Sequence, residues 1–205
     1  MVVVVGGHSR NVGKTSVAAA LIAATRHAGW TAVKITQYGH GRCATEGEEC
    51  ECAASDPAHP FAIDEETAPS HTDSGRFLAA GAKRAFWVRT RIGDLGHAMP
   101  ALRRIVAESA HTIVESNSVM NFLVPDLYIA VLDFGAEDMK ESARLFLPRA
   151  DALAVTGGSR PEGGWLGIPA RWLAAKPVFA APPPGYANVD LARLVEAQLG
   201  SSSTH

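Results

Sequence analysis

The sequence predicts an α/β fold in which a doubly wound, mostly parallel sheet carries helices on both faces. Two observations lead to this prediction. Short β-branched or apolar runs alternate with helical periodicity along the 205 residues, which is typical of parallel strands joined by crossover helices. The first run, residues 2–5, is Val throughout, as expected for a strand that is covered on both faces.

The remaining elements follow at short spacing, with one exception. An Ala-rich helix over 15–27 stops at Gly29, a strand covers 31–35, and residues 37–72 show little periodicity, which predicts a long insertion. Beyond it we expect helices at 74–82, 95–109, 138–146, 170–174 and 189–199, and strands at 84–89, 111–115, 127–132, 152–155 and 177–179. One domain is expected over 1–200, with 201–205 as a disordered tail.

Composition excludes several classes of protein. Apolar residues make up 47% and charged residues 20% of the chain, so it is not intrinsically disordered. The net charge of −2 argues against bulk nucleic-acid binding. No run reaches the length of a transmembrane helix, the N-terminus lacks a signal peptide, and three Cys are too few for a disulfide scaffold. We therefore expect a cytoplasmic protein with neither nucleic acid nor membrane as a partner.

The strongest motif, Gly-Gly-His-Ser-Arg-Asn-Val-Gly-Lys-Thr-Ser over residues 6–16, lies between the first strand and the first helix. A helix N-terminus at a Gly-rich turn offers unpaired amides to phosphates, as in a Walker A loop. Lys14 would bring a charge to the β- and γ-phosphates, and the Thr15 hydroxyl would bind Mg²⁺. His8 stands where the usual spacing has Gly, so the loop is one residue longer. The candidate nucleotide-binding residues of this loop are Gly7, His8, Asn11, Val12, Gly13, Lys14, Thr15 and Ser16.

This lengthened loop resembles that of two P-loop NTPase families, dethiobiotin synthetase and the molybdopterin-guanine dinucleotide biosynthesis adaptor protein (MobB). Residues 33–36 resemble the end of the second strand of dethiobiotin synthetase, which implies that Lys34 faces the substrate and the γ-phosphate. Residues 73–82 are similar to the Asp-(Thr/Ser)-x-Arg-x-x-x-Ala-Gly-Ala stretch of the MobB family, which implies that Asp73 and Arg76 lie near the nucleotide or substrate. Because related proteins are often dimers, we expect a homodimer.

A P-loop site also needs a second carboxylate that organises Mg²⁺. Glu115 and Asp133 each end a predicted strand, where the ligand crevice of a parallel sheet lies. We favour Glu115, with Thr15, because its strand is expected beside the P-loop strand; Asp133 remains the alternative. Lys140 is expected as a surface residue that pairs with an acid. The simpler interpretations of Asp73 and Arg76 are a helix N-cap and a surface charge.

All three Cys lie within the insertion. Cys43, Cys50 and Cys52 are flanked by His40 and His59. Thiolates and imidazoles suit Zn²⁺ or part of an iron–sulfur cluster. The alternative is a loop with free or redox-active thiols, and the insertion is also a candidate substrate lid.

Three functions fit these observations. The first is an enzyme that binds ATP and Mg²⁺ and transfers the γ-phosphate to a small acceptor, as the resemblance to dethiobiotin synthetase implies, with Lys14, Lys34 and Glu115 as catalytic residues. The second is a MobB-like nucleotide-binding adaptor that serves a partner enzyme in molybdenum cofactor biosynthesis. The third is a metallochaperone NTPase that uses the Cys cluster. ATP is favoured over GTP because Thr-Gly-Gly at 156–158 replaces a guanine-recognition motif.

Overall fold

The computed structural model describes residues 1–38 and 60–201. They form one eight-stranded sheet with the strand order β3-β4-β2-β5-β1-β6-β7-β8. Seven strands are parallel, and the edge strand β3 pairs antiparallel with β4. The strands are β1 (Val2–Gly7), β2 (Thr31–Tyr38), β3 (Phe61–Glu65), β4 (Arg84–Arg91), β5 (Thr112–Glu115), β6 (Leu127–Asp133), β7 (Ala152–Gly157) and β8 (Val178–Ala180).

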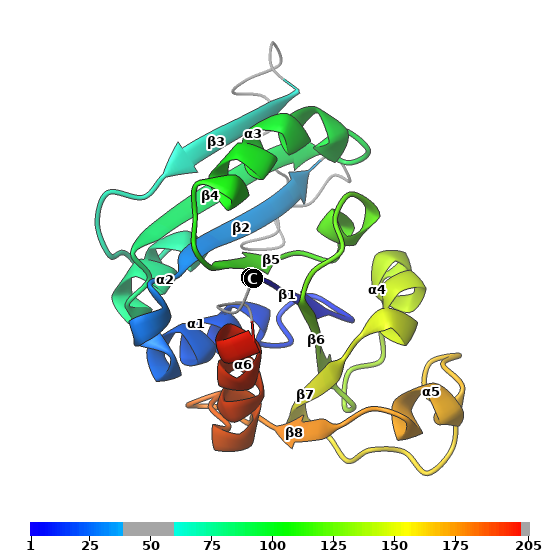
Figure 1. Cartoon of the computed structure of the whole chain (residues 1–205). Helices are drawn as coiled ribbons and strands as arrows, with labels where there is room; N and C mark the ends of the chain where they lie inside the picture. The colour runs from blue at the N-terminus through cyan, green and yellow to red at the C-terminus, as the bar shows by residue number, and fades with distance from the viewer. Residues whose placement is uncertain (39–59, 202–205) are drawn as a thin grey trace.

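Helices cover both faces of this sheet, as the sequence predicts. They are α1 (Lys14–Ala24), α2 (Asp73–Ala80), α3 (Leu95–Ala107), α4 (Glu141–Phe146), α5 (Ala170–Ala174) and α6 (Val189–Ser201). Helices α1, α2 and α6 lie on one side, and α3, α4 and α5 lie on the other (Figure 1). The mostly parallel, two-sided architecture is consistent with an α/β P-loop fold.

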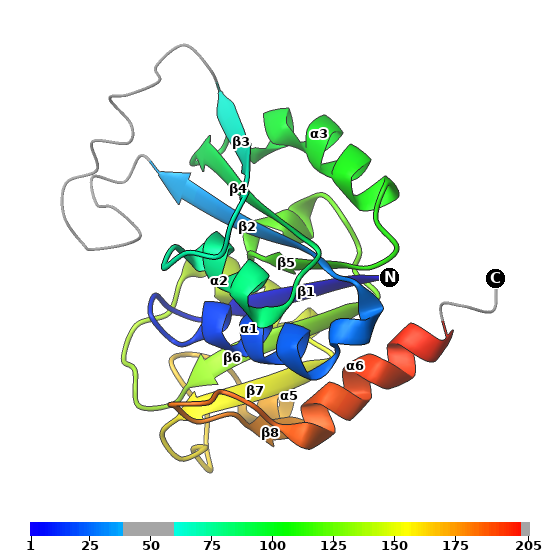
Figure 2. The same ribbon diagram turned by 90° about the vertical axis from the view of Figure 1, so that its left-hand side faces the viewer.

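The central strand β1 is covered on both faces, which explains why its consecutive positions are all apolar. Successive side chains of a strand point to opposite faces. Val3 and Val5 therefore belong to the core under α1, α2 and α6, while Val4 belongs to the core under α3, α4 and α5. All three are fully buried. Figure 2 shows the N-terminus at the end of β1 opposite the loop that leads into α1.

Two elements differ from the sequence prediction. Strand β3 lies within the segment expected to lack regular structure; it is a five-residue edge strand of mixed polarity, so its period-2 signal is weak. Helix α4 begins at Glu141 rather than at 138, because the backbone of Lys140 is extended, with φ −66° and ψ 142°. The Lys140 N–H donates to the His8 carbonyl over 2.7 Å and is thereby held outside the helix.

Candidate functional site

The loop between β1 and α1 has the backbone geometry of an anion cradle. Asn11 and Gly13 adopt left-handed conformations, with φ 55° and 87°. Gly13 is the N-cap of α1, and no side chain caps the first amides of that helix. Left-handed residues in turns and uncapped helix amides both form concave anion sites. The loop therefore presents N–H groups of its own backbone to a ligand.

A cleft of about 800 Å³ opens over this loop. Of the nucleotide-binding residues expected in the loop, Asn11, Gly13, Lys14, Thr15 and Ser16 line it. Gly7, His8 and Val12 are buried and do not line it.

Lys14 reaches back over the loop. Its Nζ donates to the Ser9 carbonyl over 2.6 Å. Burial, reinforced by the charge of Lys140, lowers the pKa of Lys14 to about 8. Among the residues that the structure describes, no carboxylate forms an ion pair with this ammonium. A bound phosphate would relieve this arrangement.

Thr15, Glu115 and Lys34 meet at one point beside the loop. The Thr15 hydroxyl donates to Glu115 Oε2 over 2.7 Å, and Lys34 Nζ lies 2.6 Å from Glu115 Oε1. Lys34 Nζ also approaches the Thr15 hydroxyl at 3.3 Å. The pairing of the strands explains why these side chains lie together. Strand β5 lies between β1 and β2, and Lys34 of β2 is directly opposite Glu115 of β5.

Asp73 joins this cluster from α2. Its Oδ2 lies 2.8 Å from Lys34 Nζ. Burial alone would lower the pKa of Lys34. The negative charges of Glu115 and then of Asp73 outweigh the effect of burial, so the pKa of this lysine is raised. The N-cap of α2 is Thr72, whose side chain accepts from the Gly75 N–H over 3.0 Å, so Asp73 is not the cap.

Arg76 lies one turn further along α2. It contacts Asp73 at 3.7 Å, and its Nη2 donates to the Ser16 hydroxyl over 2.8 Å. Arg76 is therefore more than an isolated surface charge: it ties α2 to the first turn of α1 and lines the cleft.

Glu115 and Asp133 have different surroundings. Both β5 and β6 flank β1, so adjacency to the P-loop strand does not distinguish them. Asp133 accepts from the Gly135 N–H over 2.9 Å and packs against Gly157, on the far side of β6. Glu115 alone of the two lines the cleft.

The His8 side chain is turned away from the cleft. It is 1% exposed, and its ring lies 4.7 Å from that of Trp165 in an edge arrangement. Neither ring nitrogen has a hydrogen-bond partner among the residues that the structure describes. Burial lowers the pKa of His8, so the imidazole is held neutral in an apolar setting.

Several cleft residues have contacts that the sequence does not predict. Asn117 binds both polar backbone groups of Gly7, donating to its carbonyl over 2.8 Å and accepting from its N–H over 2.9 Å. Lys140, expected as an ion-paired surface residue, instead lines the cleft and forms no ion pair with the described carboxylates. Ser116 and Ser118, which the sequence places in a turn beside the acceptor, also line the cleft. Other lining residues that the sequence did not single out include Arg10, Gln37, Ile92, Asp138, Glu141, Ser142 and Tyr186. Sequence patterns do not reveal these contacts, since most join segments far apart in the chain.

The oxygen atoms of Thr15 and Glu115 are the hard donors that Mg²⁺ prefers. Their 2.7 Å contact places both beside the phosphate loop. No group of three His, Cys, Asp or Glu side chains suited to a metal occurs within 1–38 and 60–201. Mg²⁺ in nucleotide sites needs fewer protein ligands than this, because phosphates and water complete its shell. The residues present therefore fit a nucleotide-bound Mg²⁺.

The predicted Zn²⁺ or iron–sulfur ligands, Cys43, Cys50, Cys52 and His40, lie outside the described residues, as does His59. In the described part of the chain, no helix has both the length and the apolar character needed to cross a bilayer.

Comparison with known proteins identifies no family for this chain. No protein-family model matches it, and no curated protein matches it. Among solved structures, it is similar to the "apo" form of LpxK from Aquifex aeolicus in complex with ATP, with a TM-score of 0.48 and 16% identity. The match covers 87% of this chain and 53% of that chain, so this chain spans about half of the other's length. A likeness of this size does not establish a shared activity.

Proposed function

We propose that this protein binds ATP with Mg²⁺ and transfers the γ-phosphate to a small acceptor. The observation that carries the proposal is the meeting of Thr15, Glu115 and Lys34 beside a left-handed, uncapped phosphate loop. Phosphoryl transfer depends on positioning and on charge stabilisation rather than on covalent chemistry by the protein. A cleft that brings hydroxyl, carboxylate and ammonium groups to a phosphate cradle supplies these elements.

In the proposed site each residue has a distinct role. The amides of the loop hold the phosphates, while Lys14 and Lys34 neutralise charge on the transferred group. Thr15 and Glu115 would hold Mg²⁺, which would supply further neutralisation of phosphate charge. Lys34 forms an ion pair with Glu115 in this structure, so the carboxylate is held in place beside the loop.

The acceptor would lie beyond the phosphates, next to the segment that follows β5. Ser116, Asn117 and Ser118 line this part of the cleft, and the Ser118 hydroxyl donates to Gln37 Oε1 over 2.5 Å. These polar groups suit an acceptor with a hydroxyl or carboxylate. The resemblance to dethiobiotin synthetase supports a carboxylate or carbamate.

ATP is the proposed nucleotide. Strand β7 ends at Gly157, and the segment that follows it starts with Gly158. This segment lacks the Asp that would read the N1–H and N2–H groups of guanine. The test is calorimetric titration of ATP and GTP, each with Mg²⁺, into wild-type and Lys14→Ala protein. ATP binding that vanishes in the variant supports the proposal, and preference for GTP or binding of neither nucleotide overturns it. An acceptor screen for ³²P transfer from γ-labelled ATP then tests the reaction.

A MobB-like adaptor is the second candidate, because the Asp73–Arg76 segment that carries the resemblance lies at the cleft. Slow hydrolysis without a small-molecule acceptor would favour it. The metallochaperone hypothesis stays a prediction from the sequence, tested by metal analysis of the purified protein. A homodimer is likewise proposed, and sedimentation analysis tests it.

A further inference from the structure

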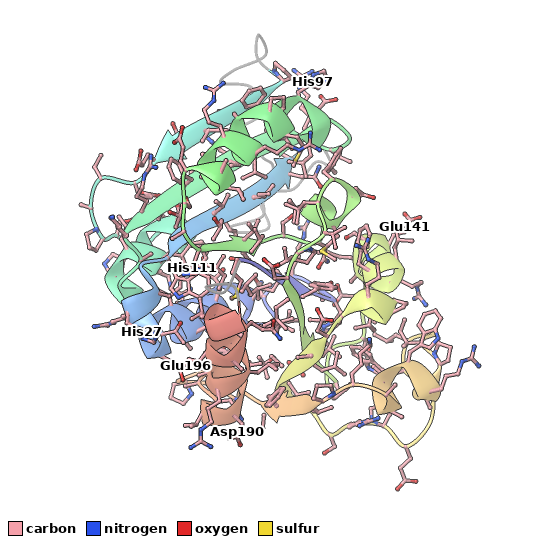
Figure 3. All side chains as sticks on the ribbon, in the orientation of Figure 1. His27, His97, His111, Glu141, Asp190 and Glu196 are labelled. Atoms are coloured by element: carbon pink, nitrogen blue, oxygen red, sulfur yellow. The ribbon has the colours of Figure 1, made fainter. Side chains whose placement is uncertain are left out.

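Lys140 lies at a place that the nucleotide-binding motif does not account for. It precedes α4 on the side of β1 opposite Lys34, since β6 and β5 flank β1 on different sides. Figure 3 marks the next residue, Glu141, at the first turn of α4. The side chain of Lys140 nevertheless lines the same cleft as Lys14 and Lys34.

Two hydrogen bonds fix this residue to the phosphate loop. The Lys140 N–H donates to the His8 carbonyl over 2.7 Å. Two residues earlier, the Asp138 carboxylate accepts from the Ser9 hydroxyl. The start of α4 is therefore bound to the loop itself, and Lys140 keeps its position relative to any phosphate held there.

The described carboxylates near Lys140 do not pair with it, although Glu115 and Asp138 attract its charge. Glu115 and Asp73 pair with Lys34, and Asp138 accepts from Ser9. Among residues 1–38 and 60–201, no carboxylate forms an ion pair with Lys140. Of the charges that act on Lys14, that of Lys140 has the largest effect. Two ammonium groups that face one cleft and repel each other are stabilised by an anion between them.

We propose that Lys140 contacts the terminal phosphate of the bound nucleoside triphosphate, opposite Lys34. Lys14, Lys34 and Lys140 would then surround the transferred group on three sides. This inference rests on the proposed function, and it adds a residue that no part of the loop motif contains. Burial lowers the pKa of Lys140, with Arg10 reinforcing the effect, and a phosphate in contact would oppose this shift.

The test compares nucleotides with and without the terminal phosphate. A non-hydrolysable ATP analogue and ADP, each with Mg²⁺, are titrated into wild-type protein and into Lys140→Ala, Lys140→Arg and Lys83→Ala. Lys83 is an exposed lysine away from the cleft, so its variant controls for the loss of one positive charge. Circular dichroism establishes that each variant is folded.

We expect Lys140→Ala to weaken analogue binding about tenfold or more, the usual effect of losing one charge-assisted hydrogen bond. ADP binding should change less than twofold, Lys140→Arg should retain most of the analogue affinity, and Lys83→Ala should match wild type. An equal loss of both ligands in Lys140→Ala, or no loss of either, overturns the inference while wild-type binding still supports the proposed function. If wild-type protein binds neither ligand, the proposed function fails as well.

Discussion

The side chain of Asn117 binds the backbone of Gly7 at a point where strand β5 no longer pairs with β1. The last partner of β5 on β1 is Val5, which pairs with Glu115. Gly7 lies two residues beyond, and its N–H and carbonyl both bind the amide of Asn117, at 2.9 and 2.8 Å. One side chain therefore satisfies a backbone donor and an acceptor at the point where the sheet becomes the phosphate loop.

Replacement of Asn117 by Ala should lower the free energy of unfolding by about 1–3 kcal/mol, because it leaves two backbone groups of the buried Gly7 unpaired. Urea denaturation measures this. Asn121→Ala is the control, since Asn121 is exposed and its amide donates to the nearby Ser118 carbonyl. Equal effects of the two substitutions would contradict the account of Asn117.

Mg²⁺ should increase the affinity for ATP, and Glu115→Gln should make this increase about tenfold smaller. The substitution removes the charge from one of the two proposed Mg²⁺ ligands. Calorimetric titration of ATP with Mg²⁺ and with EDTA measures this gain. Asp133→Asn is the matched control: it removes a strand-end carboxylate that lies outside the cleft. A gain that is lost equally in both variants would reject the assignment of Glu115.

Gly13→Ala should destabilise the protein through two separable effects. The left-handed conformation, at φ 87°, costs a residue with a Cβ about 1–2 kcal/mol. The new Cβ would also lie 2.5 Å from Tyr186 Cε1, which adds an overpacking cost of about 1–3 kcal/mol.

Gly29→Ala isolates the first of these effects, because Gly29 is left-handed and a Cβ at this position would have no atom within 4 Å. Gly13→Ala in a Tyr186→Ala background should lose only that conformational cost relative to Tyr186→Ala alone. Thermal or urea unfolding of the four variants completes the cycle. Additive effects would show that Tyr186 does not crowd Gly13.

The unfolding free energy should fall as the pH decreases below about 6.5, the ordinary pKa of His. Burial lowers the pKa of His8 in the folded protein, so the unfolded chain takes up a proton first and is stabilised by acid. The charges that face His8 are Asp138 and Asp133, which oppose this shift, and Lys14, which adds to it. His111 contributes with the same sign, since burial and the N-terminal amine lower its pKa.

Urea unfolding between pH 5 and 8 measures this slope. His8→Phe keeps an aromatic ring against Trp165 and removes the titrating group, so the slope should become shallower without vanishing. An unaltered slope in His8→Phe would mean that His8 is not the group that titrates.

The order of the elements could be predicted because β-branched runs and glycines mark strands and helix ends directly. Local sequence patterns suffice to predict the Val strand and the helix that starts after Gly13. Strand β3 could not be predicted, because its five residues, three apolar followed by two acidic, do not alternate in polarity. The distinction between Glu115 and Asp133 was also out of reach, since both strands flank β1.

Site residues outside the motif depend on contacts between distant segments. Asn117 binds Gly7 across 110 residues, and no sequence period reports such a pair. The place of His8 in the loop predicts a position beside the phosphates, but the side chain does not line the cleft. The ring instead packs against Trp165, since alternate residues at the end of a strand point to opposite faces.

The alternation of Val3, Val4 and Val5 between the two cores has a further consequence for ligand binding. The strand that leads into the phosphate loop packs against helices on both faces. A shift of either helix layer would therefore disturb the contacts that the other layer makes with this strand. The loop that extends from this strand is also anchored at Gly7 and His8, by Asn117 and by the Lys140 N–H. Its ligand would not have to offset the entropy of arranging the backbone, and most of the contact energy would remain available as affinity.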